Sequence, residues 1–133
     1  LRIIEAGEKD FHFAYDTDAA LEEKIEAVAV KVYGAEGVDY APAAAKELKR
    51  LAELGYGSLP VCMAKTQYSL SDDPAKLGAP KGFRITVQKV KASAGAGFVV
   101  VLTGDIMTMP GLPKVPAAEN IDVDENGRIT GLF

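Results

Sequence analysis

Residues 93–113 read SAGAGFVVVLTGDIMTMPGLP, and this stretch decides most of the expected fold. Gly95 and Gly97 can adopt positive φ angles without steric cost, so the backbone can reverse tightly there. Phe98–Leu102 has no polar alternation, which predicts a strand buried on both faces of a sheet. Pro110 and Pro113 then favour a loop. The stretch therefore predicts the second half of a hairpin in the hydrophobic core.

The first strand of that hairpin is expected at Phe83–Val90, because only the short Ser93–Gly97 connection separates the two runs. Its apolar residues alternate with polar ones up to Val87, but Val90 is out of phase with them. A shift of phase within a strand indicates an extra residue, so we expect a β-bulge near Lys89.

Two helices are predicted before these strands. The first follows an N-cap at Thr17 or Asp18 and ends at Gly34, and the second begins at Pro42 and ends at Gly55. Each has one apolar face, which is typical of a helix packed on a core. The apolar residues are Leu21, Ile25, Val28 and Val32 in the first helix and Ala44, Leu48 and Leu51 in the second.

The remaining apolar runs predict further short strands. They lie at Val61–Ala64, Ile121–Val123 and Arg128–Thr130, and the alternation of Phe11, Phe13 and Tyr15 adds one more. Helices early and strands late indicate an α+β fold with two layers, in which the N-terminal helices pack on a mainly antiparallel sheet. The chain has 133 residues without a repeat or linker, so a single domain over residues 1–133 is expected.

Composition restricts the class of protein. The net charge of −4 argues against a nucleic-acid partner, and no apolar run has the length of a membrane helix. Cys62 is the only cysteine, so no internal disulfide can form, which favours a cytoplasmic location. The chain starts at Leu1 rather than at methionine, and we expect it to be a fragment of a longer protein or a processed product.

Lys65–Asp72, with the sequence KTQYSLSD, is the most polar segment with the composition of a binding site. It follows a predicted strand and offers a cation, an amide and several hydroxyls to a ligand. The alternative is that Ser71, Asp72 and Asp73 form a turn before Pro74, and that the hydroxyls satisfy the local backbone.

Other candidate sites are weaker. Asp122–Gly127 imitates half of a calcium-binding loop, but position twelve of that loop would be Phe133 instead of glutamate, so a hairpin turn is expected. His12 has no neighbouring histidine or cysteine with which to bind a metal, and Cys62 is expected to be a small buried apolar residue. No Gly-Lys dipeptide occurs, which excludes a Walker phosphate-binding loop from these residues.

Four segments together resemble the C-terminal region of formate–tetrahydrofolate ligases, also called 10-formyltetrahydrofolate synthetases. They are VYGAEGVDYAP at residues 32–42, LGYGSLPVCMAKTQYSLSDDP at 54–74, the opening stretch at 93–113 and IDVDENGRITGLF at 121–133. The resemblance covers nearly the whole chain in order. One departure is Gln88, where the family often has arginine.

The resemblance implies an enzyme that uses ATP to convert formate and tetrahydrofolate into 10-formyltetrahydrofolate through formyl phosphate, in one-carbon metabolism. It also implies magnesium, a monovalent cation and a homotetramer for the full-length enzyme. The family's ATP-binding loop and pterin-stacking aromatic residues lie upstream of the matched region. We therefore assign no catalytic, cofactor-binding or metal-binding residue here, and expect a structural C-terminal domain that is inactive alone and contacts the remainder of the ligase chain. The alternative is a noncatalytic ligand-binding or assembly module derived from that domain.

Overall fold

The structure is a computed structural model that describes residues 2–5, 7, 12–106 and 114–131. Its helices are α1 (Arg2–Glu5), α2 (Leu21–Lys31) and α3 (Pro42–Glu53), with a 3-10 turn at Ala117–Glu119. Its strands are β1 (Val38–Tyr40), β2 (Val61–Ala64), β3 (Ile85–Ser93), β4 (Phe98–Thr103), β5 (Asp122–Val123) and β6 (Ile129–Thr130). Within these residues, no helix is long and apolar enough to cross a membrane.

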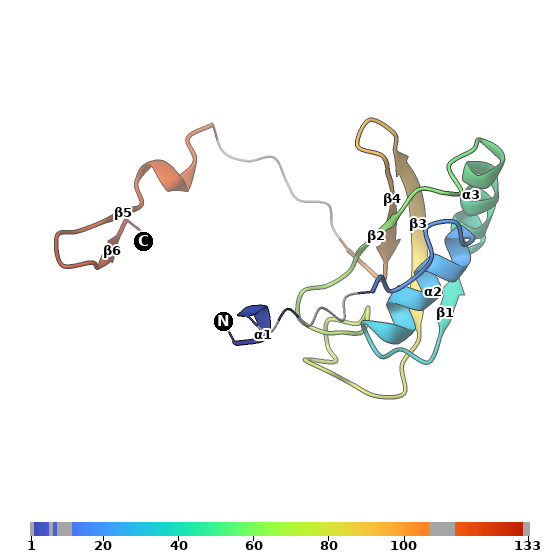
Figure 1. Cartoon of the computed structure of the whole chain (residues 1–133), viewed down its shortest axis with the longest axis horizontal. Helices are drawn as coiled ribbons and strands as arrows, with labels where there is room; N and C mark the ends of the chain where they lie inside the picture. The colour runs from blue at the N-terminus through green and yellow to red at the C-terminus, as the bar shows by residue number, and fades with distance from the viewer. Residues whose placement is uncertain (1, 6, 8–11, 107–113, 132–133) are drawn as a thin grey trace.

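The main sheet has the strand order β1-β3-β4-β2 (Figure 1). The central β3 and β4 are antiparallel, but the outer pairs β1–β3 and β2–β4 are both parallel. The α+β fold is therefore confirmed, whereas the sheet is mixed rather than mainly antiparallel. The reason is connection length, because only a short loop between neighbouring strands forces them to be antiparallel. Long segments separate β1 from β3 and β2 from β4, so these pairs can be parallel. The strand β1 itself was not predicted.

The β3–β4 hairpin forms as predicted, with Ser93 paired to Phe98. Its turn is closed by the N–H groups of Ala96 and Gly97, which donate to the Ser93 carbonyl at 3.0 and 2.9 Å. Gly97 has a φ of 75°, so this is the glycine that the reversal requires. The register shifts between Val87 and Lys89, which confirms the predicted bulge.

The two long helices follow the predicted pattern, except at the start of α2. Its N-cap is Ala20, which makes no side-chain capping bond, rather than Thr17 or Asp18. The Asp16 carboxylate instead accepts the Asp18 N–H at 3.0 Å, so the polar residues form a turn ahead of the helix. Gly34, at a φ of 74°, lies beyond the last turn, and α3 begins at Pro42 and ends before Gly55 as predicted.

Both helices pack on one face of the sheet, which confirms the two-layer arrangement (Figure 1). The predicted residues of α3 are all buried. In α2, Val28 is only half-buried, and Val32 is exposed because the helix ends at Lys31. The main core consists of Leu21, Ile25, Ala44, Leu48, Leu51, Val87, Val90, Val99 and Val101, and a second cluster of Ala29, Ala35, Phe83 and Ile85 adjoins it.

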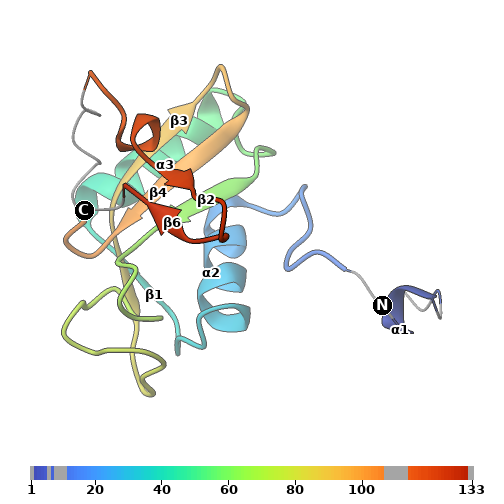
Figure 2. The ribbon, with the colours of Figure 1, turned by 90° about the vertical axis from the view of Figure 1, so that its left-hand side faces the viewer.

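The opposite face of the sheet is not covered in the same way. Along β4, Val99, Val101 and Thr103 are buried, and the residues between them are only half-buried. The prediction that Phe98–Leu102 is buried on both faces is therefore wrong for the described part of the chain. Figure 2 shows the sheet from this side, with α3 behind the strands.

The two ends of the chain differ from this sheet domain. Residues 12–16 form no strand, which corrects the prediction from Phe11, Phe13 and Tyr15, and Phe11 itself lies outside the described residues. The Tyr15 hydroxyl accepts the Val61 N–H at 3.1 Å, so this segment contacts β2.

The predicted C-terminal hairpin is confirmed as β5–β6. Every described side chain in residues 114–131 is exposed. Pro110 and Pro113 lie outside the described residues.

Candidate functional site

The segment Lys65–Asp72 leaves the end of β2 and folds back on itself. The Lys65 ammonium donates to the Thr66 carbonyl at 2.7 Å and to the Ser69 carbonyl, and it lies 5.3 Å from the centre of the Tyr33 ring. Burial lowers the pKa of Lys65, although the charge of Asp72 raises it. The Lys65 ammonium, which was the candidate cation for a ligand, is therefore already hydrogen-bonded within the loop.

The hydroxyls of this segment are also used internally. Ser69 and Ser71 are buried, and their Oγ atoms lie 2.8 Å apart. The Ser69 Oγ accepts the Ser71 N–H at 3.0 Å, and the Ser71 Oγ accepts the Asp73 N–H at 3.2 Å. These contacts support the turn interpretation of the sequence. An open depression of about 480 Å³ borders Lys65–Leu70, Tyr33, Gly78 and Ala79.

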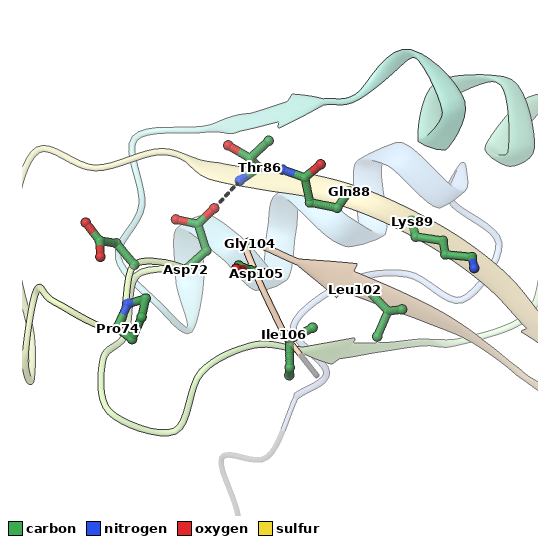
Figure 3. A pocket seen from close by; sticks show the side chains of 10 residues that line it. Asp72, Pro74, Thr86, Gln88, Lys89, Leu102, Gly104, Asp105 and Ile106 are labelled. Atoms are coloured by element: carbon green, nitrogen blue, oxygen red, sulfur yellow. Dashed lines mark hydrogen bonds between the residues drawn. The ribbon is translucent and has the colours of Figure 1, made fainter. Parts of the chain in front are cut away.

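A larger pocket, of about 710 Å³, lies beyond Asp72 at the end of the sheet. Asp72 Oδ2 accepts the Thr86 N–H at 2.7 Å, which ties the loop to β3 (Figure 3). Gly104 donates its N–H to the Thr86 carbonyl at 3.0 Å, directly after β4. The pocket is lined by Asp72, Asp73, Pro74, Thr86, Gln88, Lys89, Leu102, Gly104, Asp105 and Ile106.

Gly104 allows the Asp72 loop to lie against the end of β4. Its φ is +58°, and a Cβ at this position would overlap the Asp72 carbonyl oxygen. A larger residue would therefore be strained and would also overlap the loop. This role of Gly104 was not predicted, although a Thr-Gly-Asp turn directly after an apolar strand was a signal for it.

The chemistry of the pocket does not suit a nucleotide. Three aspartates and one lysine line it, so its charge would repel a triphosphate. Gln88, the position where the resembled family often has arginine, also lines it. No group of three or more histidine, cysteine, aspartate or glutamate residues in the described part of the chain has the geometry of a metal site.

The other residues that the sequence singled out include Cys62 and the aspartates of the C-terminal hairpin. Cys62 is exposed, which corrects the expectation of a buried residue. In the C-terminal hairpin, Asp124 Oδ1 accepts the N–H groups of Asn126 and Arg128, each at 2.9 Å. These two hydrogen bonds are typical of a turn closed by an aspartate side chain. The absence of calcium binding stays a prediction.

The helices and the mixed sheet define a two-layer α+β fold. Comparison with known proteins supplies the family. The formate–tetrahydrofolate ligase family model matches residues 1–133, so the chain belongs to that family. A formate–tetrahydrofolate ligase of Symbiobacterium thermophilum is 61% identical over 134 residues. That alignment includes 99% of this chain but only 24% of the relative, so the chain spans about a quarter of the relative's length.

Proposed function

We propose that this chain is the C-terminal domain of a cytoplasmic formate–tetrahydrofolate ligase that acts in one-carbon metabolism. The observation that carries the proposal is the match of the whole chain to this family, together with the small share of the relative that it spans. In the complete enzyme, a formate oxygen attacks the γ-phosphate of ATP and gives formyl phosphate and ADP. The N10 amine of tetrahydrofolate then attacks the formyl carbon, and phosphate leaves.

Within that enzyme, we assign this chain a structural role. Phosphoryl transfer depends on amides, cations and magnesium positioned around the phosphates. The sequence has no Gly-Lys dipeptide for such a loop, and the pocket of about 710 Å³ beside Asp72 is acidic. Magnesium and the monovalent cation are therefore proposed for the complete homotetrameric enzyme, and no step of the reaction is assigned to residues of this chain.

The proposal is tested with two proteins, the 133-residue chain and the same chain joined to the upstream sequence encoded with it. We expect the chain alone to show no micromolar binding of Mg-ATP by calorimetry and no formation of 10-formyltetrahydrofolate. We expect the longer protein to turn over formate, ATP and tetrahydrofolate. Steady turnover by the chain alone would contradict the structural role. A longer protein without a phosphate-binding loop and without turnover would favour the noncatalytic module instead.

A further inference from the structure

The sheet face that lacks helices carries the polar residues Lys89, Lys91 and Ser93 on β3, but the β4 residues paired with them have the wrong pattern for a strand exposed to water. A strand with one wet face alternates apolar residues with polar ones. In β4 the residues that point away from the helices are Phe98, Val100 and Leu102, all apolar and all half-buried. The sequence of β4 therefore favours burial of this side rather than contact with solvent.

The neighbouring edge strand extends this apolar surface. The β2–β4 register pairs Cys62 with Val100 and Ala64 with Leu102, and paired residues lie on the same face of a sheet. Cys62 is exposed and Ala64 is half-buried. We call these five residues the open patch: Cys62, Ala64, Phe98, Val100 and Leu102.

The described elements do not cover the open patch. The core places α2 and α3 on the side of Val99 and Val101, which is the other face of β4. The tail does not cover it either, because every described side chain in residues 114–131 is exposed. Leu102 of the patch also lines the acidic pocket (Figure 3).

We propose that the open patch is the surface on which the remainder of the ligase polypeptide packs. This inference rests on the proposed function, because the matched region is only 24% of the relative's length and most of that protein lies outside it. A third layer from that polypeptide completes the burial of β4, as layered domains require. Strand β4 is then buried on both faces in the complete enzyme, as its sequence favours.

Cys62 is a built-in reporter for this packing, because it is the only cysteine of the chain and lies in the patch. Its alkylation by N-ethylmaleimide is measured by mass spectrometry in the full-length ligase and in the 133-residue chain. The matched reference is Ala45→Cys, a thiol on the exposed side of α3. In the full-length ligase we expect Cys62 to react on the order of 100-fold more slowly than the reference thiol, as a group that is reached only by local opening does. In the chain alone the two thiols should react at similar rates.

Three outcomes would overturn the inference. Rapid alkylation of Cys62 in the full-length ligase would mean that the patch is exposed. Slow alkylation in the chain alone would mean that its own tail covers the patch. Protection of the full-length ligase that is lost on dilution would identify a second copy of the protein as the occupant. Ligase turnover is measured on the same samples: turnover with rapid alkylation overturns this inference alone, whereas absent turnover overturns the proposed function.

A second pair of variants tests the same surface without a thiol. Val100→Lys places a charge in the open patch, and Ala45→Lys places one on the exposed side of α3. We expect Val100→Lys to lower the Tm of the full-length ligase much more than that of the 133-residue chain, because only the former buries the charge. Ala45→Lys should leave both Tm values nearly unchanged. Equal losses of Tm in the two proteins for Val100→Lys would contradict the inference.

Discussion

The two faces of the central sheet are built from the same strands but have different burial. On one face, Val99 and Val101 are fully buried beneath α2 and α3. On the other face, the equally apolar Val100 and Leu102 are only half-buried. Strand composition alone therefore does not distinguish a residue in the core of this chain from one on its half-buried face. The following variants measure how much the two faces differ in their contribution to the stability of the protein.

The largest contrast is expected between a leucine of the covered face and one of the open face. Leu48 on α3 is 1% exposed in the core, so Leu48→Ala should cost about 2–5 kcal/mol of unfolding free energy. Leu102→Ala should cost about 1 kcal/mol in the 133-residue chain, since its side chain is only half-buried. Urea denaturation of the two variants gives both values. Equal losses would mean that the open face already belongs to the core of this chain.

A second contrast concerns two glycines at opposite ends of β4. Gly97 and Gly104 both have positive φ, at 75° and 58°, so alanine at either position should cost about 1–2 kcal/mol through backbone strain. A Cβ at Gly97 meets nothing within 4 Å, whereas one at Gly104 would overlap the Asp72 carbonyl. Gly104→Ala should therefore be clearly the more destabilising in urea melts. If Gly97→Ala costs as much, the overlap at Asp72 is relieved by movement of the loop.

The predictable parts of this fold are those with local causes. Pro42 and Gly55 bound α3 because their conformational preferences act within one helix, and the β3–β4 hairpin follows from a short glycine-containing turn. The bulge at Lys89 was visible as a phase shift between Val87 and Val90. By contrast, the three residues of β1 have no distinctive periodicity, and their parallel pairing with β3 depends on the path of the whole intervening chain.

The candidate site was located from the sequence only in part. The polar segment at Lys65–Asp72 borders two depressions, but its lysine and serines are partnered within the loop. Thr86 and Gly104 join Asp72 from β3 and from the end of β4. That meeting depends on the strand order, which no local pattern in the sequence encodes.

The buried Lys24 of α2, unlike the apolar core residues, should make the stability of the protein depend on pH. Lys24 is fully buried, and its ammonium donates to the carbonyls of Gly57 and Leu59 at 2.8 and 3.1 Å. Burial lowers the pKa of Lys24 below its ordinary 10.5, although Asp18 and Asp16 raise it. The unfolded chain therefore binds more protons in the window between the two values, and stability rises with pH there.

The test compares the parent protein with Lys24→Met, in which this titration is removed. We expect the Tm of the parent, relative to that of the variant, to increase as the pH rises toward 10.5, the ordinary pKa of lysine. Scanning calorimetry at several pH values measures the difference. Parallel pH dependences for the two proteins would show that the pKa of Lys24 is the same in the folded and unfolded chains.

The smallest effect is expected for the ion pair between β1 and the start of β3. Arg84 Nε and an η nitrogen donate to the two Asp39 carboxylate oxygens at 2.9 and 2.8 Å, and the pair is largely exposed. The hydrogen bond from Arg84 holds the pKa of Asp39 below its ordinary 3.8. Stability from this carboxylate is therefore present above 3.8 and is lost as the pH falls through its folded pKa.

We expect Asp39→Asn to lower the Tm at neutral pH by less than the leucine and glycine variants above do, because solvent and salt screen an exposed pair. The difference from the parent should shrink further in 1 M salt, and it should vanish at a pH well below 3.8, where the parent carboxyl is also neutral. Glu47→Gln, which breaks the exposed Arg50–Glu47 contact within α3, is the matched control. A loss of Tm for Asp39→Asn as large as that for Leu48→Ala, and insensitive to salt, would mean that Arg84 anchors β1 to the sheet and that this edge belongs energetically with the covered face.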